Sequence, residues 1–113
     1  MLSHHHQGSP YAKGQFSITV CFPHDYPFGA PEIRFNTPIF HPNVWSDGRL
    51  CWHSNDEHGS AYFADALISA VNILLVEPNP HSAANGEAAR LYNSQRGEYI
   101  RRAEAHTKEH AWF

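Results

Sequence analysis

A proline-rich segment between two alternating stretches constrains the fold of this chain most. Residues 23–31, PHDYPFGAP, carry three prolines and a glycine within nine positions. Proline fixes φ and lacks an amide donor, so this segment is predicted to be an ordered loop and neither a strand nor a helix. Apolar and polar residues alternate on each side of it. The chain is therefore expected to begin with two strands joined by an ordered loop.

Alternation also predicts which face each strand buries. In GQFSITVCF (14–22) the apolar residues point to one side and the polar ones to the other, the apolar set being Phe16, Ile18, Val20 and Phe22. In EIRFN (32–36), Ile33 and Phe35 point inward. A period of two is typical of a half-buried antiparallel strand. RLCW (49–52) is predicted to be a further short extended segment, followed by a loop over 53–60.

The second half of the chain has helical spacing instead. A helix is predicted from residue 64, with its apolar face formed by Ala64, Leu67, Ile68, Val71, Leu74 and Leu75. Two prolines around Asn79 end it. Asn85 is a candidate cap for the next helix, with Glu87 in its first turn. The helical spacing continues through Ala88, Tyr92, Tyr99 and Ala103, and Gly97 is expected to weaken the middle of this stretch.

Strands that precede helices favour an α+β fold, here an antiparallel β-meander followed by helices. A chain of 113 residues is one domain by the usual length prior, and 42% hydrophobic residues can build a modest core. We expect residues 1–10 to be an irregular N-terminal segment and residues 11–113 to form the core domain. The histidine run at positions 4–6 is left out of the functional argument.

Charge and composition exclude several classes of partner. The formal charge is −3 and the eight lysines and arginines are scattered, so we expect no binding to nucleic acid. No apolar run approaches the roughly 20 residues of a membrane span, and no signal peptide is evident, so no membrane association is expected. Cys21 and Cys51 make a poor disulfide framework, which favours a reducing compartment, the cytoplasm or the nucleus.

Cys51 lies in the block HPNVWSDGRLCW (41–52) and allows several kinds of chemistry. A zinc site formed with His53 and His58 would lack a fourth ligand, so we expect no metal. A cysteine hydrolase would need an oriented base, and His41 and His53 are candidates by proximity alone. The simplest alternative is a buried cysteine that acts as a small apolar side chain. Proximity in the sequence does not decide among these.

A family resemblance covers nearly the whole chain, from about Gly8 to the end. Four blocks occur in order: residues 8–35 around the proline loop, HPNVWSDGRLC, LLVEPNP with SAANGEAARLY, and RGEYIRRAEAHTKEHAW. Together they resemble the catalytic core of the ubiquitin-conjugating enzymes. The step of eight residues from Asn43 to Cys51, behind a Tyr-Pro-Phe loop, is the most specific part of the match.

The resemblance implies a function for Cys51. In this family the cysteine accepts ubiquitin or a ubiquitin-like protein from an activating enzyme as a thioester, and passes it to a substrate lysine or to a ligase. A carrier needs no Cys–His pair, because the activating enzyme delivers an energised acyl group, and no cofactor is implied. Asn43 matches the residue that stabilises the developing oxyanion or holds the active-site loop, and both roles stay open. His41 and Pro42 are expected to shape the turn.

Other positions gain expected roles by the same resemblance. Ser82 falls where many relatives have an aspartate that orients or deprotonates the incoming lysine. Phe28 matches the position that inserts into ligases. Pro27 and Tyr62 are expected to complete this partner-binding surface.

The chain departs from the family pattern at three places. It begins after the family's first helix and first strand, which leaves SITVCF with an unpaired edge. The segment after Cys51 lacks the Trp-Ser-Pro signal, and Trp52 replaces an aliphatic residue. Two functions therefore remain: a ubiquitin-conjugating transferase that uses Cys51, or a catalytically degenerate variant that acts as a binding or scaffold module.

Overall fold

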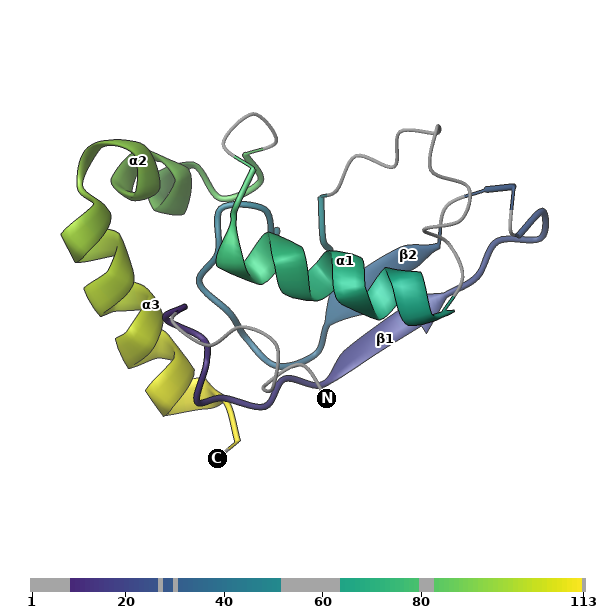
Figure 1. The fold of residues 1–113 in the computed structure, drawn as a ribbon, viewed down its shortest axis with the longest axis horizontal. Coiled ribbons are helices and arrows are strands. Elements are labelled where there is room, and N and C mark those ends of the chain that lie inside the picture. Colours follow the sequence, from purple (N-terminus) through teal and green to yellow (C-terminus); the bar gives the residue numbers. More distant parts are fainter. Residues whose placement is uncertain (1–8, 27, 30, 52–63, 80–82, 113) are drawn as a thin grey trace.

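The computed structural model describes residues 9–26, 28–29, 31–51, 64–79 and 83–112 of the chain. The described elements follow the order β1 (Ile18–Cys21), β2 (Glu32–Phe35), α1 (Ala64–Val76), α2 (Gly86–Ser94) and α3 (Arg96–His110). Figure 1 shows α1 lying across the two strands, with α2 and α3 together at one end. The predicted α+β class is confirmed. The expected irregular structure of residues 1–8 lies outside the described part of the chain.

The two strands pair antiparallel with Ile18 opposite Phe35 and Val20 opposite Ile33. Ile33 and Phe35 are buried, as their alternation predicts. A slip of one residue would turn both side chains to solvent, so the core itself specifies this register. The prediction that Phe22 lies in the strand, on the same side as Ile18 and Val20, is wrong. β1 ends at Cys21, and Phe22 is 55% exposed with its ring packed edge-to-face on Tyr26.

A third extended segment completes the meander on the far side of β2. The amide of Leu50 donates to the carbonyl of Ile33 at 2.9 Å, and the amide of Phe35 donates to the carbonyl of Gly48 at 2.7 Å. Arg34 also forms an isolated antiparallel bridge with Arg49. Residues 48–50 therefore continue the sheet next to β2, which carries the chain directly to Cys51.

α1 covers the inner face of this sheet. Its residues Leu67, Val71 and Leu75, at helical spacing, are buried in the same core cluster as Ile33 and Phe35. The helix ends at Val76, before Pro78, as the proline pattern predicts. None of the described helices is both long and apolar enough to cross a bilayer.

The C-terminal helical stretch is interrupted at a different residue than expected. α2 ends at Ser94 and α3 begins at Arg96, so the break falls at Gln95, while Gly97 lies within the first turn of α3. The prediction for Asn85 is confirmed. Its side chain accepts a hydrogen bond from the amide of Ala88 at 3.1 Å, which satisfies a donor that the helix start leaves free.

Two buried tyrosines connect the N-terminal turn to α3 and to the centre of the molecule. The hydroxyl of Tyr11 donates to the carbonyl of Phe40, and the hydroxyls of Tyr11 and Tyr99 lie 2.7 Å apart. Burial raises the pKa of Tyr99 to about 12 and that of Tyr11 well above its usual range, so both stay neutral donors. This network holds the residue that directly precedes His41.

Candidate active site

The loop that ends at Cys51 is a turn followed by a short hairpin. The amide of Val44 donates to the carbonyl of His41 at 3.2 Å, and Val44 and Leu50 form an antiparallel bridge. At the hairpin tip, Gly48 has φ +95° and lies against the carbonyl of Phe35. Only glycine takes up this conformation without a steric cost. The hairpin thus returns the chain to Cys51 beside the His-Pro-Asn turn.

His41 is fully buried and serves the turn with both ring nitrogens. Its Nδ1 accepts from the amide of Asn43 at 3.0 Å, so the ring proton of the neutral imidazole is on Nε2, which donates to the carbonyl of Leu74 at 2.9 Å. Burial lowers the pKa of His41 to about 4, although the bond to Leu74 opposes this shift. At neutral pH the ring is therefore uncharged and joins the turn to the end of α1.

Asn43 is also buried, and its side chain pairs with a backbone segment after α1. Its Nδ2 donates to the carbonyl of Asn79 at 2.7 Å, and its Oδ1 accepts from the amide of Asn79 at 2.8 Å. A neighbouring contact fixes the same turn to α2, because the carbonyl of Pro42 accepts from the amides of Ala84 and Asn85 at 2.8 and 3.0 Å. The turn is thus hydrogen-bonded to residue 79, after α1, and to residues 84 and 85, at the start of α2.

Cys51 is attached to this anchored turn through its own backbone. Its amide donates to the carbonyl of Asn43 at 2.7 Å. The thiol is free and half-buried, whereas the second free thiol, on Cys21, is exposed on β1. A half-buried cysteine whose amide is hydrogen-bonded to the turn has a defined position and is partly exposed. Such a site is suited to nucleophilic acyl exchange.

The arrangement disfavours a hydrolase that uses His41. Both nitrogens of that ring are hydrogen-bonded, to Asn43 and to Leu74, and the ring is buried. No cluster of three potential metal ligands occurs among the described residues. The other candidates for a base or a ligand, His53 and His58, lie outside the described residues.

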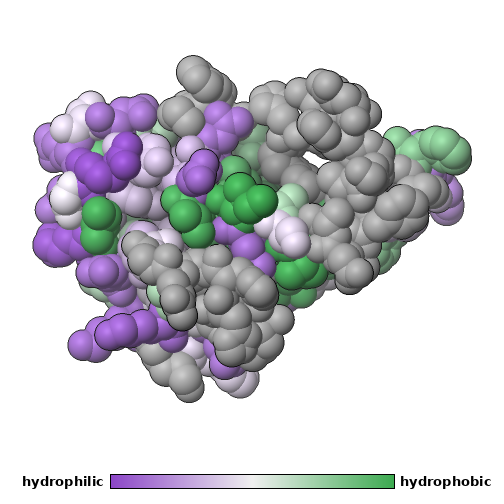
Figure 2. Space-filling view, in the orientation of Figure 1, coloured by the Kyte–Doolittle hydropathy of each residue, from purple (hydrophilic) through white to green (hydrophobic). Residues whose placement is uncertain are grey.

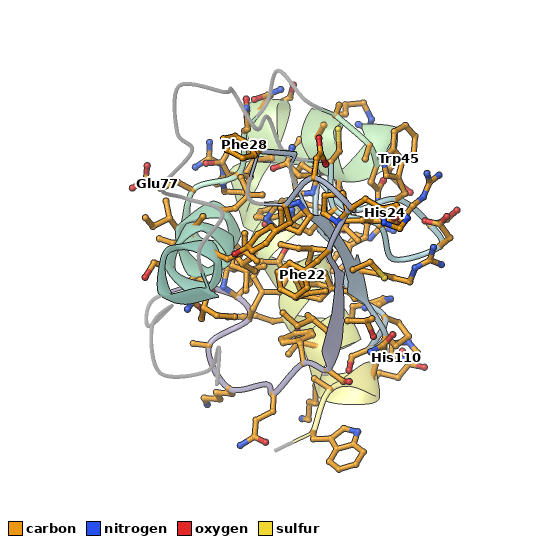
Figure 3. All side chains as sticks on the ribbon, turned by 90° about the vertical axis from the view of Figure 1, so that its right-hand side faces the viewer. Phe22, His24, Phe28, Trp45, Glu77 and His110 are labelled. Carbon is orange, nitrogen blue, oxygen red and sulfur yellow. The ribbon has the colours of Figure 1, made fainter. Side chains whose placement is uncertain are left out.

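The expected partner-binding and acceptor positions are described only in part. Phe28 is 89% exposed, and its backbone amide donates to the carbonyl of Asp25 at 2.7 Å. Figure 3 shows Phe28, Trp45 and Glu77 toward the upper end of that view, with His110 toward the lower end. Pro27, Tyr62, Ser82 and Trp52 lie outside the described residues, so their expected roles stay predictions.

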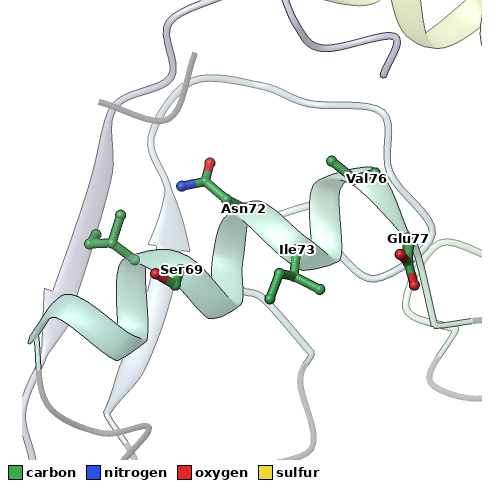
Figure 4. A pocket seen from close by; sticks show the side chains of 6 residues that line it. Ser69, Asn72, Ile73, Val76 and Glu77 are labelled. Carbon is green, nitrogen blue, oxygen red and sulfur yellow. The ribbon is translucent and has the colours of Figure 1, made fainter. Parts of the chain in front are cut away.

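The outer face of α1 presents apolar side chains to solvent. Ile73 is 62% exposed and Val76 is 41% exposed. Figure 2 shows apolar surface over α1 on this face. A shallow pocket of about 390 Å³ runs along the helix beside them, between Ser69 and Glu77 (Figure 4). Exposed apolar surface of this kind is typical of a protein-interaction site.

The site is a free thiol that follows a buried His-Pro-Asn turn in an α+β fold. Sequence comparison identifies the family to which this domain belongs. The family model described as ubiquitin-conjugating enzyme matches residues 2–107. The chain belongs to the ubiquitin-conjugating enzyme family, as its sequence blocks predict.

Individual relatives agree with this assignment. Ubiquitin-conjugating enzyme E2 2 of Mycosarcoma maydis is 38% identical over 106 residues, which cover 93% of this chain and 57% of that protein. Probable ubiquitin-conjugating enzyme E2 31 of Arabidopsis thaliana is 34% identical over 105 residues, which cover 92% of this chain and 68% of that protein. The chain thus spans between about half and two thirds of the length of these relatives.

The sequence did not predict that the backbone of Asn79 binds the side chain of Asn43. The sequence identified it only as a residue between two prolines that end a helix. The backbone of Asn79 accepts a hydrogen bond from the side-chain amide of Asn43 and donates one to it. The flanking prolines were the available signal, because a proline on each side restricts the backbone and pre-orients the amide and carbonyl between them.

Proposed function

We propose that this domain carries ubiquitin or a ubiquitin-like protein as a thioester on Cys51. The half-buried thiol of Cys51, held through its amide by the carbonyl of Asn43, is the observation that carries the proposal. Membership of the ubiquitin-conjugating enzyme family supports it. Activating enzyme, ligase and substrate proteins are the proposed partners. A cytoplasmic or nuclear location remains a prediction from the cysteine content.

The proposed reaction is two successive acyl exchanges. In the first, Sγ of Cys51 attacks the thioester carbonyl on the activating enzyme. A new C–S bond forms, the old one breaks, and the departing thiolate takes the proton that Cys51 loses. In the second, a lysine amine attacks the same carbonyl and releases the Cys51 thiolate, which takes the proton of the amine. With a ligase, a ligase thiol replaces the amine.

The buried turn contributes position rather than proton transfer. Because His41 is neutral and uses both ring nitrogens, it does not act as the base for Cys51. We propose the loop-holding role for Asn43, since Oδ1 and one hydrogen of Nδ2 are engaged by the backbone of Asn79. A carrier that receives an activated acyl group needs no base paired with its thiol, and His41 is not such a base here.

A loading assay tests the proposal, and the second cysteine supplies a matched control. The chain is incubated with activating enzyme, ATP and ubiquitin, and the product is separated with and without thiol. We expect a thiol-labile adduct that Cys51→Lys converts to a thiol-resistant one and that Cys21→Ser leaves unchanged. The absence of any adduct, with ubiquitin and with ubiquitin-like proteins, would overturn the proposal and favour the degenerate binding module. An adduct that Cys21→Ser removes would also overturn it.

A further inference from the structure

The chain has two lysines, and both line one pocket. The residues of this pocket are distant in sequence from the turn at residues 41–43. Lys13 lies at the end of the N-terminal turn, and Lys108 lies in the last turn of α3. The pocket has a volume of about 740 Å³ and is lined by Ser9, Pro10, Ala12, Lys13, Glu104, Thr107 and Lys108. None of these residues belongs to the Cys51 site.

The walls of the pocket are held in place on both sides. In the turn, the amide of Tyr11 donates to Oγ of Ser9 at 3.1 Å and the amide of Gly14 donates to the carbonyl of Tyr11 at 3.0 Å. At Gly14 the turn touches α3 so closely that an added Cβ would lie 2.6 Å from Cγ2 of Thr107. A hydrogen bond between the hydroxyls of Tyr11 and Tyr99 also connects the turn to α3. A pocket between braced walls is pre-formed, which lowers the cost of ordering on binding.

The charges at the pocket do not neutralise one another. Neither Lys13 nor Lys108 forms a salt bridge with a described residue, whereas Arg34, Arg49, Arg101 and Arg102 each pair with a carboxylate. Among the described residues that line the pocket, Glu104 is the one acidic residue, so these two lysines and one glutamate have a formal charge of +1. This is a positive region on a chain whose formal charge is −3. An anionic occupant complements it.

A polar group at the inner wall also lacks a partner. Oγ1 of Thr107 is buried and makes no hydrogen bond in the described part of the chain, although the residue lines the pocket. A buried hydroxyl without a partner is unfavourable, so a ligand oxygen that reached it would be stabilised. The rest of the described wall consists of Ser9 and of apolar surface from Pro10, Ala12 and the methylene stems of the lysines.

We propose that this pocket binds a small amphipathic anion, a compact apolar body that carries one carboxylate or phosphate monoester. The anionic group lies between the ammonium groups of Lys13 and Lys108. The apolar body packs on Pro10 and Ala12. The two ammonium groups fix the orientation of the ligand, while the apolar wall supplies contact area.

A nuclear magnetic resonance titration of the full chain with octanoate, octyl phosphate and octanol tests the proposal. We expect saturable shifts at the amides of Ala12, Thr107 and Lys108, with at least one anion binding about tenfold more tightly than octanol at low salt. Comparing the two anions distinguishes carboxylate from phosphate recognition. Equal binding of octanol, or shifts spread over the whole surface, would overturn the proposal. Binding that appears only after residues 1–8 are removed would also overturn the proposal, because this N-terminal segment would then be the occupant of the pocket.

Matched variants separate charge from folding. Lys13→Gln with Lys108→Gln should weaken anion binding about tenfold, while Lys13→Arg with Lys108→Arg should keep most of it. Arg90→Gln removes an exposed cation outside the pocket and should change nothing. Glu104→Gln should tighten binding about two- to threefold by the same electrostatic argument. Anion affinity that does not respond to the double Gln variant, in protein whose thermal unfolding is unchanged, would contradict the assignment.

Discussion

The side-chain amide of Asn43 is paired with the backbone of Asn79 through two hydrogen bonds of 2.7 and 2.8 Å. The arrangement fixes the distance between the end of α1 and the loop that leads to Cys51. Nδ2 donates one of its two hydrogens to Asn79, so an oxyanion on a thioester would have to accept the other. The pairing therefore makes the two roles expected for Asn43 experimentally separable.

Asn43→Asp should destabilise the domain, because it replaces the donor with an oxygen that faces the carbonyl of Asn79. Two buried acceptors without a hydrogen between them should lower the free energy of unfolding by about 2–4 kcal/mol. Urea unfolding at pH 7 measures this loss. The matched control is Asn36→Asp, since Asn36 donates to Ser17 and Thr19 at an exposed position and should lose less than about 1 kcal/mol.

Loading and discharge rates of the same variant distinguish the roles. If Asn43 holds the loop, stability and thioester formation decline together. A variant that folds and loads normally but transfers ubiquitin slowly to free lysine would contradict the loop-holding role and restore the oxyanion role.

The stability of the domain should fall as the pH is lowered from 6.5 to 4, because His41 must stay neutral in the fold. Burial lowers its pKa from 6.5 to about 4, so the unfolded chain binds more protons throughout this window. The stability that depends on neutral His41 is fully present above pH 6.5 and is lost by about pH 4. A shift of this size corresponds to about 3 kcal/mol. Urea unfolding at half-unit pH steps measures the slope.

Two comparisons assign that slope to His41. His41→Gln should be less stable at pH 7 but should lose less stability on acidification. Desolvation also lowers the pKa of half-buried His106, so His106→Gln should flatten the profile slightly. An imidazole of His41 that titrates near pH 6.5 in the folded protein would refute this prediction.

The alternating and helical patterns predicted the elements well because each pattern is set by a single buried face. The faces of β2 and α1 follow directly from Ile33, Phe35, Leu67, Val71 and Leu75. Phe22 was misplaced because alternation gives no sign of where a strand ends. The break at Gln95 was missed for a related reason: glycine is a poor helix former but is accepted in a first turn, where Gly97 lies.

The site was predictable in outline and not in its contacts. The spacing between Asn43 and Cys51 identifies the loop, yet the contacts of Asn43 with Asn79 and of His41 with Leu74 join residues more than thirty positions apart. Such pairs depend on how α1 packs on the sheet, which local patterns do not specify. Buried polar groups need partners, so two buried polar residues in one turn imply that such partners exist but do not name them.

Gly48→Ala should destabilise the hairpin that positions Cys51. Gly48 has φ +95°, and an added Cβ would lie 2.2 Å from the carbonyl oxygen of Phe35. Relieving this clash requires the hairpin to move, and we expect a loss of about 2–4 kcal/mol in thermal or urea unfolding. Gly97→Ala is the matched control. It lies in α3 with open space around it, so it should be neutral or stabilise by up to about 1 kcal/mol. Equal effects of the two substitutions would rule out a conformational role for Gly48.

If Cys51 carries a thioester, the lysine acceptors within the chain are limited to Lys13 and Lys108. Both side chains are exposed, so their amines are open to attack on the thioester of another copy. During prolonged loading at alkaline pH we expect a thiol-resistant product to accumulate and mass spectrometry to map it to these two residues. Lys13→Arg with Lys108→Arg should remove it while the thiol-labile adduct persists, because a guanidinium stays protonated and is not a nucleophile. The double Arg variant could instead form the same amount of thiol-resistant product. If that product maps neither to residues 13 and 108 nor to the terminal amine, the acyl group leaves Cys51 by another route.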